Sequence, residues 1–417
     1  MSTNTDPTRR WLHGCPPEWE QVPVKRLFKI RKRIAGALGF DVLAVTQQGV
    51  KLKDTTSGEG QLALDYSKYQ IVETGDFAMN HMDLLTGFID ISAYNGVTSP
   101  DYRVFVPQTS VRIHKRFYLY VFQLCYLARI FYPLGQGSSQ FGRWRLPREA
   151  FEGFEIPNPP PPTQKAIADF LDRKTATIDA LIEKKKKLLD LLAEKRAALI
   201  NQAVTTGLNP NLPMKDSGVP WIGEIPAHWQ TRKLRYIAAK LQGRIIVQPH
   251  LYFADEGVPI VFGYNIKDGQ IDESGLSKVS FEADRAHSHA RAQAGDLYTV
   301  RLGSPGMTAV VPDSLDGCHF ASIMWVHQHE RANSGWLCHA MNSAVVQAQI
   351  NAANYGATLR QFNIADAVDW VLPFPPKAEQ IAIAAFLDAR LDRFLSSSRA
   401  VTEQIERLRE YRQAVIT

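Results

Sequence analysis

The chain of 417 residues repeats parts of itself at a long and nearly constant spacing. A tryptophan, a proline and a second tryptophan recur 210 positions apart, as Trp11, Pro16 and Trp19 and then as Trp221, Pro226 and Trp229. A longer match pairs six residue types of 164–172 with the same types in 380–388, at a spacing of 216. Solenoid repeats run to only roughly 20–50 residues. We therefore expect a duplicated domain, with two copies related by approximate two-fold symmetry in one polypeptide.

Each copy ends in a segment predicted to form one long helix. The proline-rich residues 157–162 cannot be helical, and no Pro or Gly follows them as far as about residue 205. Apolar residues then recur every seven positions, which predicts a helix that packs along a seam. The first seam comprises Leu171, Ile178, Leu192 and Leu199, with Lys185 at the missing step and Ile167, Leu181 and Leu188 in the complementary position. The second comprises Leu387, Phe394, Val401, Leu408 and Val415.

Two such helices would bury their seams most simply against each other. The two-fold duplication makes an antiparallel coiled coil the expected arrangement. A helix of about 40 residues reaches roughly 60 Å. The lysines at 184–187 lie mostly off the seam, so we interpret them as a solvated face, with contact to a partner or to DNA as the open alternative.

The rest of the chain mixes strand and helix patterns, which predicts an α+β fold with two tandem mixed domains. Val and Ile clusters predict strands at 42–45, 258–262 and 322–326, and helices are expected at 117–132 and 336–353. The predicted division is a first globular domain at 11–156, a long helix at 157–206, an exposed linker at 207–220, a second globular domain at 221–374 and a second long helix at 375–417.

Charge and cysteine content narrow the function classes. The 48 Lys and Arg against 42 Asp and Glu give a net charge of +6, which favours a polyanionic partner. Four cysteines without a Cys-x-x-Cys pair, and a polar N-terminus, predict a reducing, cytoplasmic location. The apolar run at 117–134 is interrupted by Gln123 and Arg129, so we expect a buried helix there and no membrane association.

The repeated residues resemble those of the specificity (S) subunits of type I restriction-modification systems, over the full length of the chain. The resemblance rests on the run S-G-V-P-W-I-G-E-I-P-A-H-W at 217–229 and its degenerate copy at 11–19. It also rests on Pro-Pro-x-x-x-Gln at 159–164 and 375–380, each followed by Phe-Leu-Asp. The first copy departs from the pattern, with His13-Gly14-Cys15 where the second has Gly223-Glu224-Ile225.

The resemblance implies two target-recognition domains separated by two long helices that act as a ruler. Each domain would read one half of a bipartite DNA site. The chain itself would be noncatalytic and would bind two methyltransferase (M) subunits that modify adenine N6, with restriction (R) subunits in the full complex. S-adenosylmethionine, ATP and Mg would belong to those partners, and no cofactor to this chain. The alternative from another class is a noncatalytic coiled-coil scaffold whose globular domains bind proteins.

Motifs for catalysis or metal binding do not fit their usual patterns. Asn158-Pro159-Pro160-Pro161 approaches the Asn-Pro-Pro-aromatic motif of amino-methyltransferases but lacks the aromatic residue. The chain has no G-x-x-x-x-G-K-[ST] phosphate loop. Eight His and Cys residues between 287 and 339 lack the paired spacing of a structural zinc site, so no catalytic residue and no metal site is predicted.

Polar loop residues are the candidates for DNA contact, because Arg and Lys bind phosphates while Arg, Asn and Gln read base edges. In the first domain they are Gln47, Gln48, Asn80, His81, Ser139, Gln140, Arg143 and Arg145. In the second they are Tyr264, Asn265, Lys267, Arg301, Asn354, Tyr355, Arg360 and Gln361. The pairs Gln140/Arg143 and Arg360/Gln361 follow the predicted helix in each copy and are the preferred groove readers. A solvated surface side chain is the alternative for each.

Overall fold

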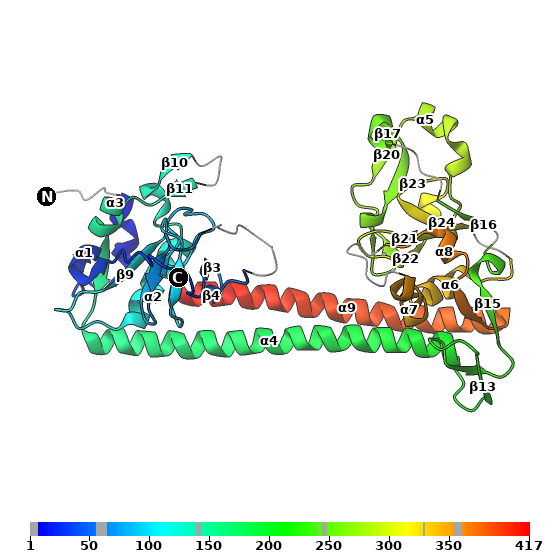
Figure 1. Ribbon diagram of the computed structural model, residues 1–417, viewed down its shortest axis with the longest axis horizontal. Coiled ribbons are helices and arrows are strands. Elements are labelled where there is room, and N and C mark those ends of the chain that lie inside the picture. The colour runs from blue at the N-terminus through cyan, green and yellow to red at the C-terminus, as the bar shows by residue number, and fades with distance from the viewer. Residues whose placement is uncertain are drawn as a thin grey trace. The chain divides into compact units, whose positions relative to one another are not determined.

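The computed structural model describes residues 7–55, 65–138, 143–238, 240–243, 248–327, 330–353 and 361–417, with residues 7–10, 138 and 143 described by their backbone alone. The chain divides into two compact units. The first contains Met1–Lys185 and Glu403–Thr417, and the second contains Lys186–Thr402. The division falls inside the two long helices, α4 (Pro161–Thr206) and α9 (Lys377–Ile416). Each unit therefore contains one globular region and one part of each helix (Figure 1).

The globular part of the first unit is built on a four-stranded antiparallel sheet in the order β2-β9-β6-β7. Helix α2 packs on this sheet, and Phe28, Phe77 and Phe105 of the strands contact Phe122 of the helix. The strands are β1 (Glu20–Pro23), β2 (Phe28–Ile30), β3 (Leu43–Thr46), β4 (Gly49–Leu52), β5 (Gln70–Val72), β6 (Phe77–Met79), β7 (Ile89–Ile91), β8 (Gly96–Thr98), β9 (Arg103–Pro107), β10 (Gln136–Ser138), β11 (Arg143–Arg145) and β12 (Glu155–Asn158). The helices are η1 (Pro7–Gly14), α1 (Val24–Leu27), α2 (Lys115–Leu127), η2 (Tyr132–Leu134) and α3 (Arg148–Gly153).

The second unit has a matching four-stranded sheet in the order β16-β24-β21-β22, to which a three-stranded sheet, β20-β17-β23, is added. The strands are β13 (Met214–Asp216), β14 (Glu224–Pro226), β15 (Gln230–Lys233), β16 (Lys240–Gln242), β17 (Phe253–Phe262), β18 (Ile266–Lys267), β19 (Gln270–Ile271), β20 (Ser277–Val279), β21 (Leu297–Val300), β22 (Thr308–Val310), β23 (His319–Ala321), β24 (Ile323–His327) and β25 (Val371–Phe374). The helices are η4 (Leu234–Tyr236), η5 (Pro249–Tyr252), α5 (Phe281–Ala286), η6 (Gly263–Asn265), η7 (Ser288–Ala290), η8 (Asp313–Leu315), α6 (Ser334–Met341), α7 (Ala344–Ala353) and α8 (Ile364–Ala367).

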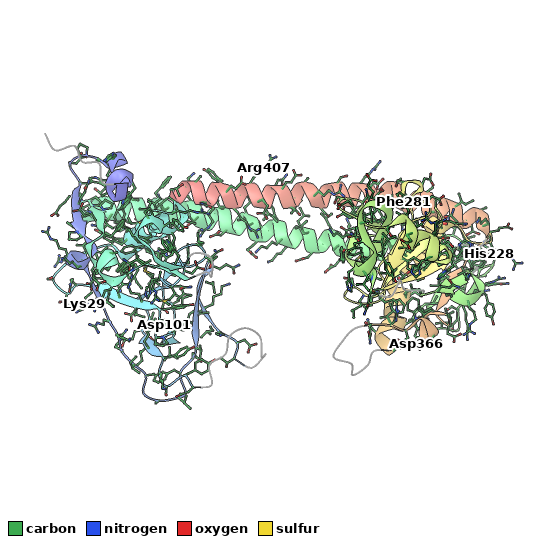
Figure 2. All side chains as sticks on the ribbon, turned by 90° about the horizontal axis from the view of Figure 1, so that it is seen from above. Lys29, Asp101, His228, Phe281, Asp366 and Arg407 are labelled. Atoms are coloured by element: carbon green, nitrogen blue, oxygen red, sulfur yellow. The ribbon has the colours of Figure 1, made fainter. Side chains whose placement is uncertain are left out.

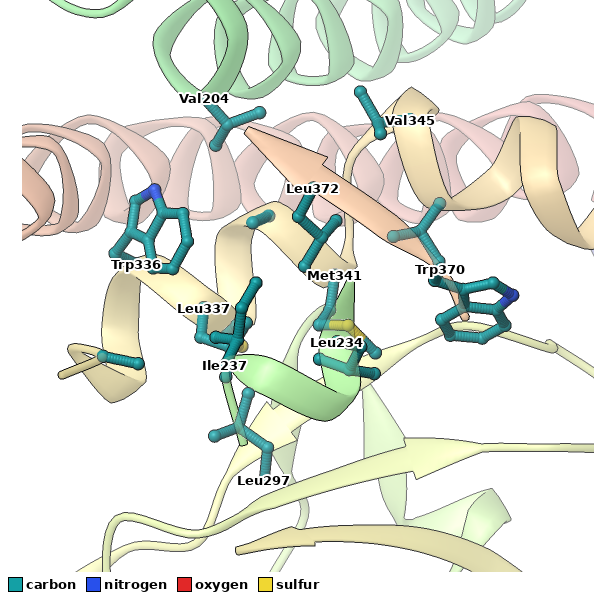
Figure 3. Packing of buried hydrophobic residues seen from close by; sticks show 14 of the residues in the cluster. Val204, Leu234, Ile237, Leu297, Trp336, Leu337, Met341, Val345, Trp370 and Leu372 are labelled. Carbon is teal, nitrogen blue, oxygen red and sulfur yellow. The ribbon is translucent and has the colours of Figure 1, made fainter. Parts of the chain in front are cut away.

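The core of the second unit joins the globular region to the long helices. Leu297 of the sheet, Trp336 and Leu337 of α6, and Val204 near the end of α4 belong to one buried cluster (Figure 3). Ile383 and Leu387 of α9 belong to the same cluster. The helices are thus part of the domain core, because their apolar faces are buried against it.

A Gly-Asp turn at the start of a central strand confirms that the two units are copies of one fold. Gly75 and Gly295 both have a positive φ, 89° and 87°, which glycine adopts without strain. The following residues, Asp76 and Asp296, are buried, and a carboxylate oxygen of each accepts a hydrogen bond from the backbone N–H three residues earlier. The strand orders of the two four-stranded sheets then correspond one to one, with β6 matching β21.

A glutamine at the start of each long helix makes the same hydrogen bonds in both units. Gln164 and Gln380 are 1% and 0% exposed, and their side-chain amides donate to the carbonyl oxygens of Pro159 and Pro375 at 2.8 and 2.9 Å. Their amide oxygens accept from the backbone N–H groups of His114 and Asn333, which precede α2 and α6. Each glutamine therefore ties a long helix to the domain helix beside it.

Helix α4 begins at a proline and is followed by a glycine. The prediction that residues 157–162 are not helical is wrong for Pro161 and Pro162, which occupy the first turn of α4, where a missing N–H costs no hydrogen bond. The helix ends at Thr206, and Gly207 follows with φ of 74°, a conformation that favours glycine. A Cβ atom at Gly207 would also lie 3.1 Å from the ring of Trp229. Trp229 is thus a buried anchor under the end of α4.

Antiparallel packing of the two helices is confirmed within each unit. In the first unit, Arg412 of α9 donates to Asp179 of α4 at 2.7 Å, and Lys185 donates to Gln404 at 2.5 Å. In the second unit, Ile200 to Val204 share a cluster with Ile383 to Leu391. Residue numbers rise along one helix as they fall along the other.

The predicted composition of the first seam is partly wrong. Leu171 and Ile178 are 8% and 5% exposed, as expected, but Leu181 and Leu188 are 42% and 43% exposed. The complementary position is one residue later, where Ile182 is 7% exposed and Leu189 is half-buried. In a heptad, the second buried position can follow the first by three or by four residues. Helix α4 has apolar residues at both of these positions, so the sequence alone allows either seam. The second seam agrees with prediction, since Leu387 and Val401 are buried and Phe394, Leu408 and Val415 are half-buried.

Other boundaries differ in detail. The strands expected at 42–45, 258–262 and 322–326 are present as β3, β17 and β24. The single helix expected at 336–353 is two helices, because the chain turns at Asn342 and Ser343, whose side chains bond to the last carbonyls of α6. The linker at 207–220 contains strand β13, which pairs with β14. The run at 117–134 contains the buried helix α2, and no helix in the described part of the chain combines the length and hydropathy needed to span a bilayer.

Candidate nucleic-acid interface

The strand register brings several of the predicted DNA-contacting residues to one end of each four-stranded sheet. In the first unit, Met79 at the end of β6 lies opposite Arg103 at the start of β9, and the backbone N–H of Arg31, just after β2, donates to Val104. In the second unit, Val300 at the end of β21 lies opposite Ile323 at the start of β24. The residues that follow β2, β6 and β21 therefore emerge at equivalent ends, which we call the reading ends.

Three sequence-distant segments meet at the reading end of the first unit. The connection between β6 and β7, residues 80–88, lies at their centre. Gln47, in the exposed turn between β3 and β4, donates to the carbonyl oxygen of Thr86 at 3.4 Å. On the other side, the backbone N–H of Leu84 donates to the carbonyl of Trp144 in β11. The structure thus brings together the predicted residues Gln47, Gln48, Asn80, His81 and Arg145.

Beside this surface, three basic side chains lie close together, namely Arg103, His81 and Arg145. Arg103 is 5% exposed, donates to the carbonyl of Leu146 at 3.0 Å and lies over the ring of Phe151. Burial lowers the pKa of Arg103 to about 10. Burial, and then the charges of Arg103 and Arg145, lower the pKa of His81 to about 3. His81 is therefore neutral at physiological pH, and Arg145 is the exposed cation of this group.

The reading end of the second unit also combines three segments. Leu302, just after β21, forms an isolated antiparallel bridge with Gln361. The neighbouring Arg301 donates to the carbonyl oxygen of Phe362 at 3.4 Å. Gly263 packs against Val300, which places the next residue, Tyr264, at the same edge. Tyr264 is 68% exposed and stacks on Phe262 with ring centroids 5.3 Å apart.

Several predicted residues serve the fold of the domain in this structure. The side chain of Asn80 accepts a hydrogen bond from the backbone of Met82, and Asn265 is 7% exposed and accepts from the backbone of Phe262. Lys267 is exposed but forms an ion pair with Asp272 at 2.9 Å. Others lie outside the described residues or are described by backbone alone, namely Ser139, Gln140, Arg143, Asn354, Tyr355 and Arg360.

Sequence reasoning missed two features of the reading ends. Arg31 and Lys32 are exposed after β2, and the basic run that begins at Lys29 was the signal that could have identified them (Figure 2). Leu85 and Leu302 are 44% and 53% exposed on the connections that follow β6 and β21. An exposed leucine has no distinguishing sequence pattern, so only the fold identifies these two.

Three of the histidines that raised the question of zinc have aspartate partners. His319 lies 2.9 Å from Asp284, His327 lies 2.8 Å from Asp296, and His339 lies 2.7 Å from Asp388. Within the described residues, no group of three or more His, Cys, Asp or Glu side chains is arranged to hold a metal ion. Asn158, the first residue of the segment that approaches the amino-methyltransferase motif, accepts a hydrogen bond from the hydroxyl group of Tyr118 at 2.7 Å.

The reading ends offer the groups that contact nucleic acid. Guanidinium and ammonium groups bind phosphate oxygens, and amide side chains read base edges through paired donors and acceptors. In the first unit these groups are Gln47, Gln48, Arg31, Lys32 and Arg145. In the second unit Arg301, Gln361 and the exposed ring of Tyr264 occupy the equivalent end. The two ends share their position in the fold and differ in their side chains.

Comparison with known proteins identifies related specificity proteins. Residues 45–190 match a family described as the type I restriction modification DNA specificity domain. The EcoBI specificity subunit of a type I restriction enzyme of Escherichia coli is 21% identical over 268 residues, which cover 63% of this chain and 56% of the relative. The EcoKI specificity subunit of Escherichia coli strain K12 is 26% identical over 203 residues, which cover 46% of this chain and 43% of the relative. The alignments span about half the length of these relatives.

A solved structure extends the likeness in fold to almost the whole chain. It comes from a study of complex assembly and conformational transition in the type I R-M system. The match has a TM-score of 0.63 at 15% identity and covers 96% of this chain and 97% of that chain. These findings confirm the resemblance and the predicted fold class, and they do not favour the protein-binding scaffold.

Proposed function

We propose that this chain is a member of the type I restriction-modification specificity family and is the DNA sequence-specificity subunit of a type I restriction-modification complex. Each unit reads one half of a bipartite DNA site with the reading end of its sheet. The observation that carries the proposal is the equivalent placement of different polar side chains at the two reading ends. Because the polar side chains occupy equivalent places, both units can contact DNA in the same way. Because the side chains differ, each unit can recognise a different half-site.

The paired helices set the gap between the half-sites. Both helices are uninterrupted, over 46 residues in α4 and 40 in α9, and both continue into the cores of the globular regions. A seam of regular heptads stiffens a helix pair along its length. The number of helical residues then determines how far apart two readers act.

Two equivalent surfaces at the helix starts are the proposed docking sites for two methyltransferase subunits. Phe170 is 48% exposed, and the ammonium group of Lys174 lies over its ring. At the matching place in the second unit, the guanidinium group of Arg390 lies over the half-buried ring of Phe386. The same aromatic and cationic pair in both copies supports binding of the same partner twice.

Catalysis in this proposal belongs to the partners. The chain is a noncatalytic subunit of an adenine-N6 methyltransferase and ATP-dependent restriction endonuclease complex. S-adenosylmethionine, ATP and Mg are bound by the M and R subunits. Cytoplasmic placement is part of the proposal, and the free thiols of Cys15, Cys125, Cys318 and Cys338 support a reducing compartment.

Methylation mapping tests the function directly. The chain is co-expressed with its neighbouring methyltransferase subunit, and adenine methylation is mapped across the genome by single-molecule sequencing. We expect one new split motif, with two short specific halves around a fixed unspecified gap. A stable complex that methylates no motif, and that binds duplex DNA without the salt dependence of phosphate contacts, would contradict the proposal.

Single arginine variants test the assignment of one half-site to each unit. Arg145→Ala is expected to weaken recognition of one half of the motif, and Arg301→Ala that of the other half. Loss of one base or phosphate contact should lower affinity by about ten- to a hundredfold. Arg407→Ala is the control, because Arg407 is exposed on α9 and belongs to neither sheet (Figure 2). Equal damage to both halves by either variant would contradict separate readers.

A further inference from the structure

The two units expose a leucine on the same connection of their four-stranded sheets. Residues 80–88 join β6 to β7 in the first unit, and residues 301–307 join β21 to β22 in the second. The strand order and the preceding Gly-Asp turn establish that the connections are equivalent. Leu85 is 44% exposed on the first connection, and Leu302 is 53% exposed on the second. Each leucine lies at the reading end of its unit.

The connection that carries Leu85 is held rigidly. A carboxylate oxygen of Asp83 accepts hydrogen bonds from the backbone N–H groups of Leu85 and Thr86, at 2.8 and 3.3 Å. The backbone N–H of Gly87 donates to the carbonyl of Asp83 at 2.7 Å, which closes the turn. The side chain of Gln47, in the turn between β3 and β4, donates a hydrogen bond to the carbonyl oxygen of Thr86. The turn therefore presents the leucine side chain outward with little freedom to fold it back.

The connection that carries Leu302 is fixed by different contacts. The backbone N–H of Gly306 donates to the carbonyl of Val300 at 2.8 Å, and the side chain of Gln347 in α7 donates to the carbonyl of Pro305 at 3.0 Å. The bridge to Gln361 holds Leu302 itself at the backbone. Two unrelated sets of contacts thus produce the same result, an apolar side chain that projects from a rigid turn.

The surroundings of both leucines are cationic and polar, which suits DNA better than an apolar protein surface. Arg145 lies beside the first connection, and the exposed Arg31 and Lys32 follow β2, which is separated from β6 by β9 in the same sheet. Arg301 directly precedes Leu302. Apolar wedges flanked by cations are used by proteins that unstack a base step, because the cations hold the backbone while the wedge enters the stack.

We propose that Leu85 and Leu302 each insert between adjacent base pairs of their own half-site and unstack that step. This inference rests on the proposed function and names the way in which each unit engages its DNA. Insertion costs the stacking of the opened step, and the contacts that the bent duplex makes offset that cost. A step that is already unstacked also lowers the cost of extruding a nearby adenine, which a methyltransferase partner must do to reach its target.

The test uses the full chain in complex with its methyltransferase subunits and duplexes that carry the mapped motif. The fluorescent base 2-aminopurine replaces one non-target purine at a time along both half-sites, because its emission rises when it loses stacking. The variants are Leu85→Ala and Leu302→Ala, with Leu85→Met and Leu302→Met as conservative partners. Leu52→Ala and Leu251→Ala are the controls, since these leucines are 53% and 65% exposed elsewhere in the two units.

We expect the unaltered complex to raise the fluorescence at one step in each half-site. Leu85→Ala should abolish the rise in one half-site only and Leu302→Ala the rise in the other, while the methionine variants and both controls retain it. Affinity for the motif should fall by no more than about tenfold in each alanine variant, because the unstacking cost disappears together with the contact.

Three outcomes would count against the wedges, and they are distinguishable from failure of the proposed function. Specific binding of the motif without a fluorescence rise in the unaltered complex overturns the wedges and leaves the specificity role intact. The same holds if both alanine variants keep the rise. If replacing a thymine by uracil weakens binding as much as Leu85→Ala does, with no unstacking, the leucine contacts a methyl group in the major groove. Absence of any sequence-specific binding would instead reject the proposed function.

Discussion

At the scale of single residues, both copies keep a hydrogen bond between the domain helix and an aspartate of the long helix, although the donor residue differs. Tyr120 in the first unit and His339 in the second both donate to an aspartate of the neighbouring long helix, Asp172 and Asp388, at 2.7 Å. The glutamines at the helix starts are the buried case, since Gln164 and Gln380 are 1% and 0% exposed, and a buried donor or acceptor left unpaired costs about 1–3 kcal/mol. The retained residues therefore mark the junction between domain and helix, where the two copies must fold alike.

His81 gives the first unit a predictable response to acid. Its pKa is about 3 in the folded chain, against an ordinary value of 6.5, so the unfolded chain binds the proton more readily. The stability that this histidine contributes is complete above the unfolded pKa and is lost as the pH falls from 6.5 towards 3. The loss should reach up to about 1.4 kcal/mol for each pH unit in this window.

Thermal unfolding of His81→Phe and of the unaltered chain, compared across this pH window, measures the effect. In the variant, the unfolding temperature of the first unit should change less with pH than it does in the unaltered chain. His13→Phe is the matched control in the same unit, because His13 is exposed. An unchanged pH dependence in His81→Phe would show that the histidine is not buried in its neutral form.

At the scale of elements, the neighbouring residues Leu181 and Ile182 distinguish the predicted seam from the observed one. Ile182 is 7% exposed and Leu181 is 42% exposed on the same turn of α4. Ile182→Ala should lower the free energy of unfolding by about 2–4 kcal/mol, because it empties a buried site. Leu181→Ala should change it by no more than about 0.5 kcal/mol.

Chemical denaturation of the two variants compares these free energies. Both substitutions place alanine in the middle of the same helix, so the change in helix propensity is nearly shared between them. If Leu181→Ala were the more damaging variant, the seam would follow the step of three residues that the sequence suggested. The observed step of four would then be wrong.

At the scale of the whole molecule, the first unit contains residues from both the N-terminal and the C-terminal parts of the chain. Residues Glu403–Thr417 of α9 belong to the first unit, where Ile416 and Val415 pack with Leu171 and Tyr120. The first reader therefore depends on the last residues of the chain. Each long helix serves both units, and a change in the length of one helix alone would disturb the seam in both.

Insertion of one heptad into both helices should lengthen the recognised gap and leave the half-sites unchanged. The insertions follow Lys185 in α4 and precede Glu403 in α9, so the register of both seams is kept. Seven residues add about 10 Å of helix, which corresponds to about three base pairs of duplex. The gap in the methylation motif is the measurement, and insertion into α4 alone is the control that should impair the complex. A motif with its original gap would reject the helices as the ruler.

The sequence by itself determined the duplication, the two long helices and the family resemblance. These features are local or periodic. Trp19 recurs as Trp229 and Gln164 recurs as Gln380 at nearly the same spacing, and proline-rich segments mark where each helix starts. The candidate site was only partly accessible in this way. Loop polarity selected Gln47, His81, Arg145 and Arg301, which lie at the reading ends, and it also selected Asn265, whose amide is used inside the domain.

Only the tertiary structure decided which face of α4 is buried and which loops meet. Heptad spacing allows Leu181 or Ile182 in the seam, and the choice depends on the direction from which α9 and the domain core approach. Likewise, Gln47, residues 80–88 and β11 lie far apart in sequence and meet because sheet pairing brings their strand ends together. Periodicity specifies a face of an element, whereas the pairing of elements specifies which faces and which loops share a surface.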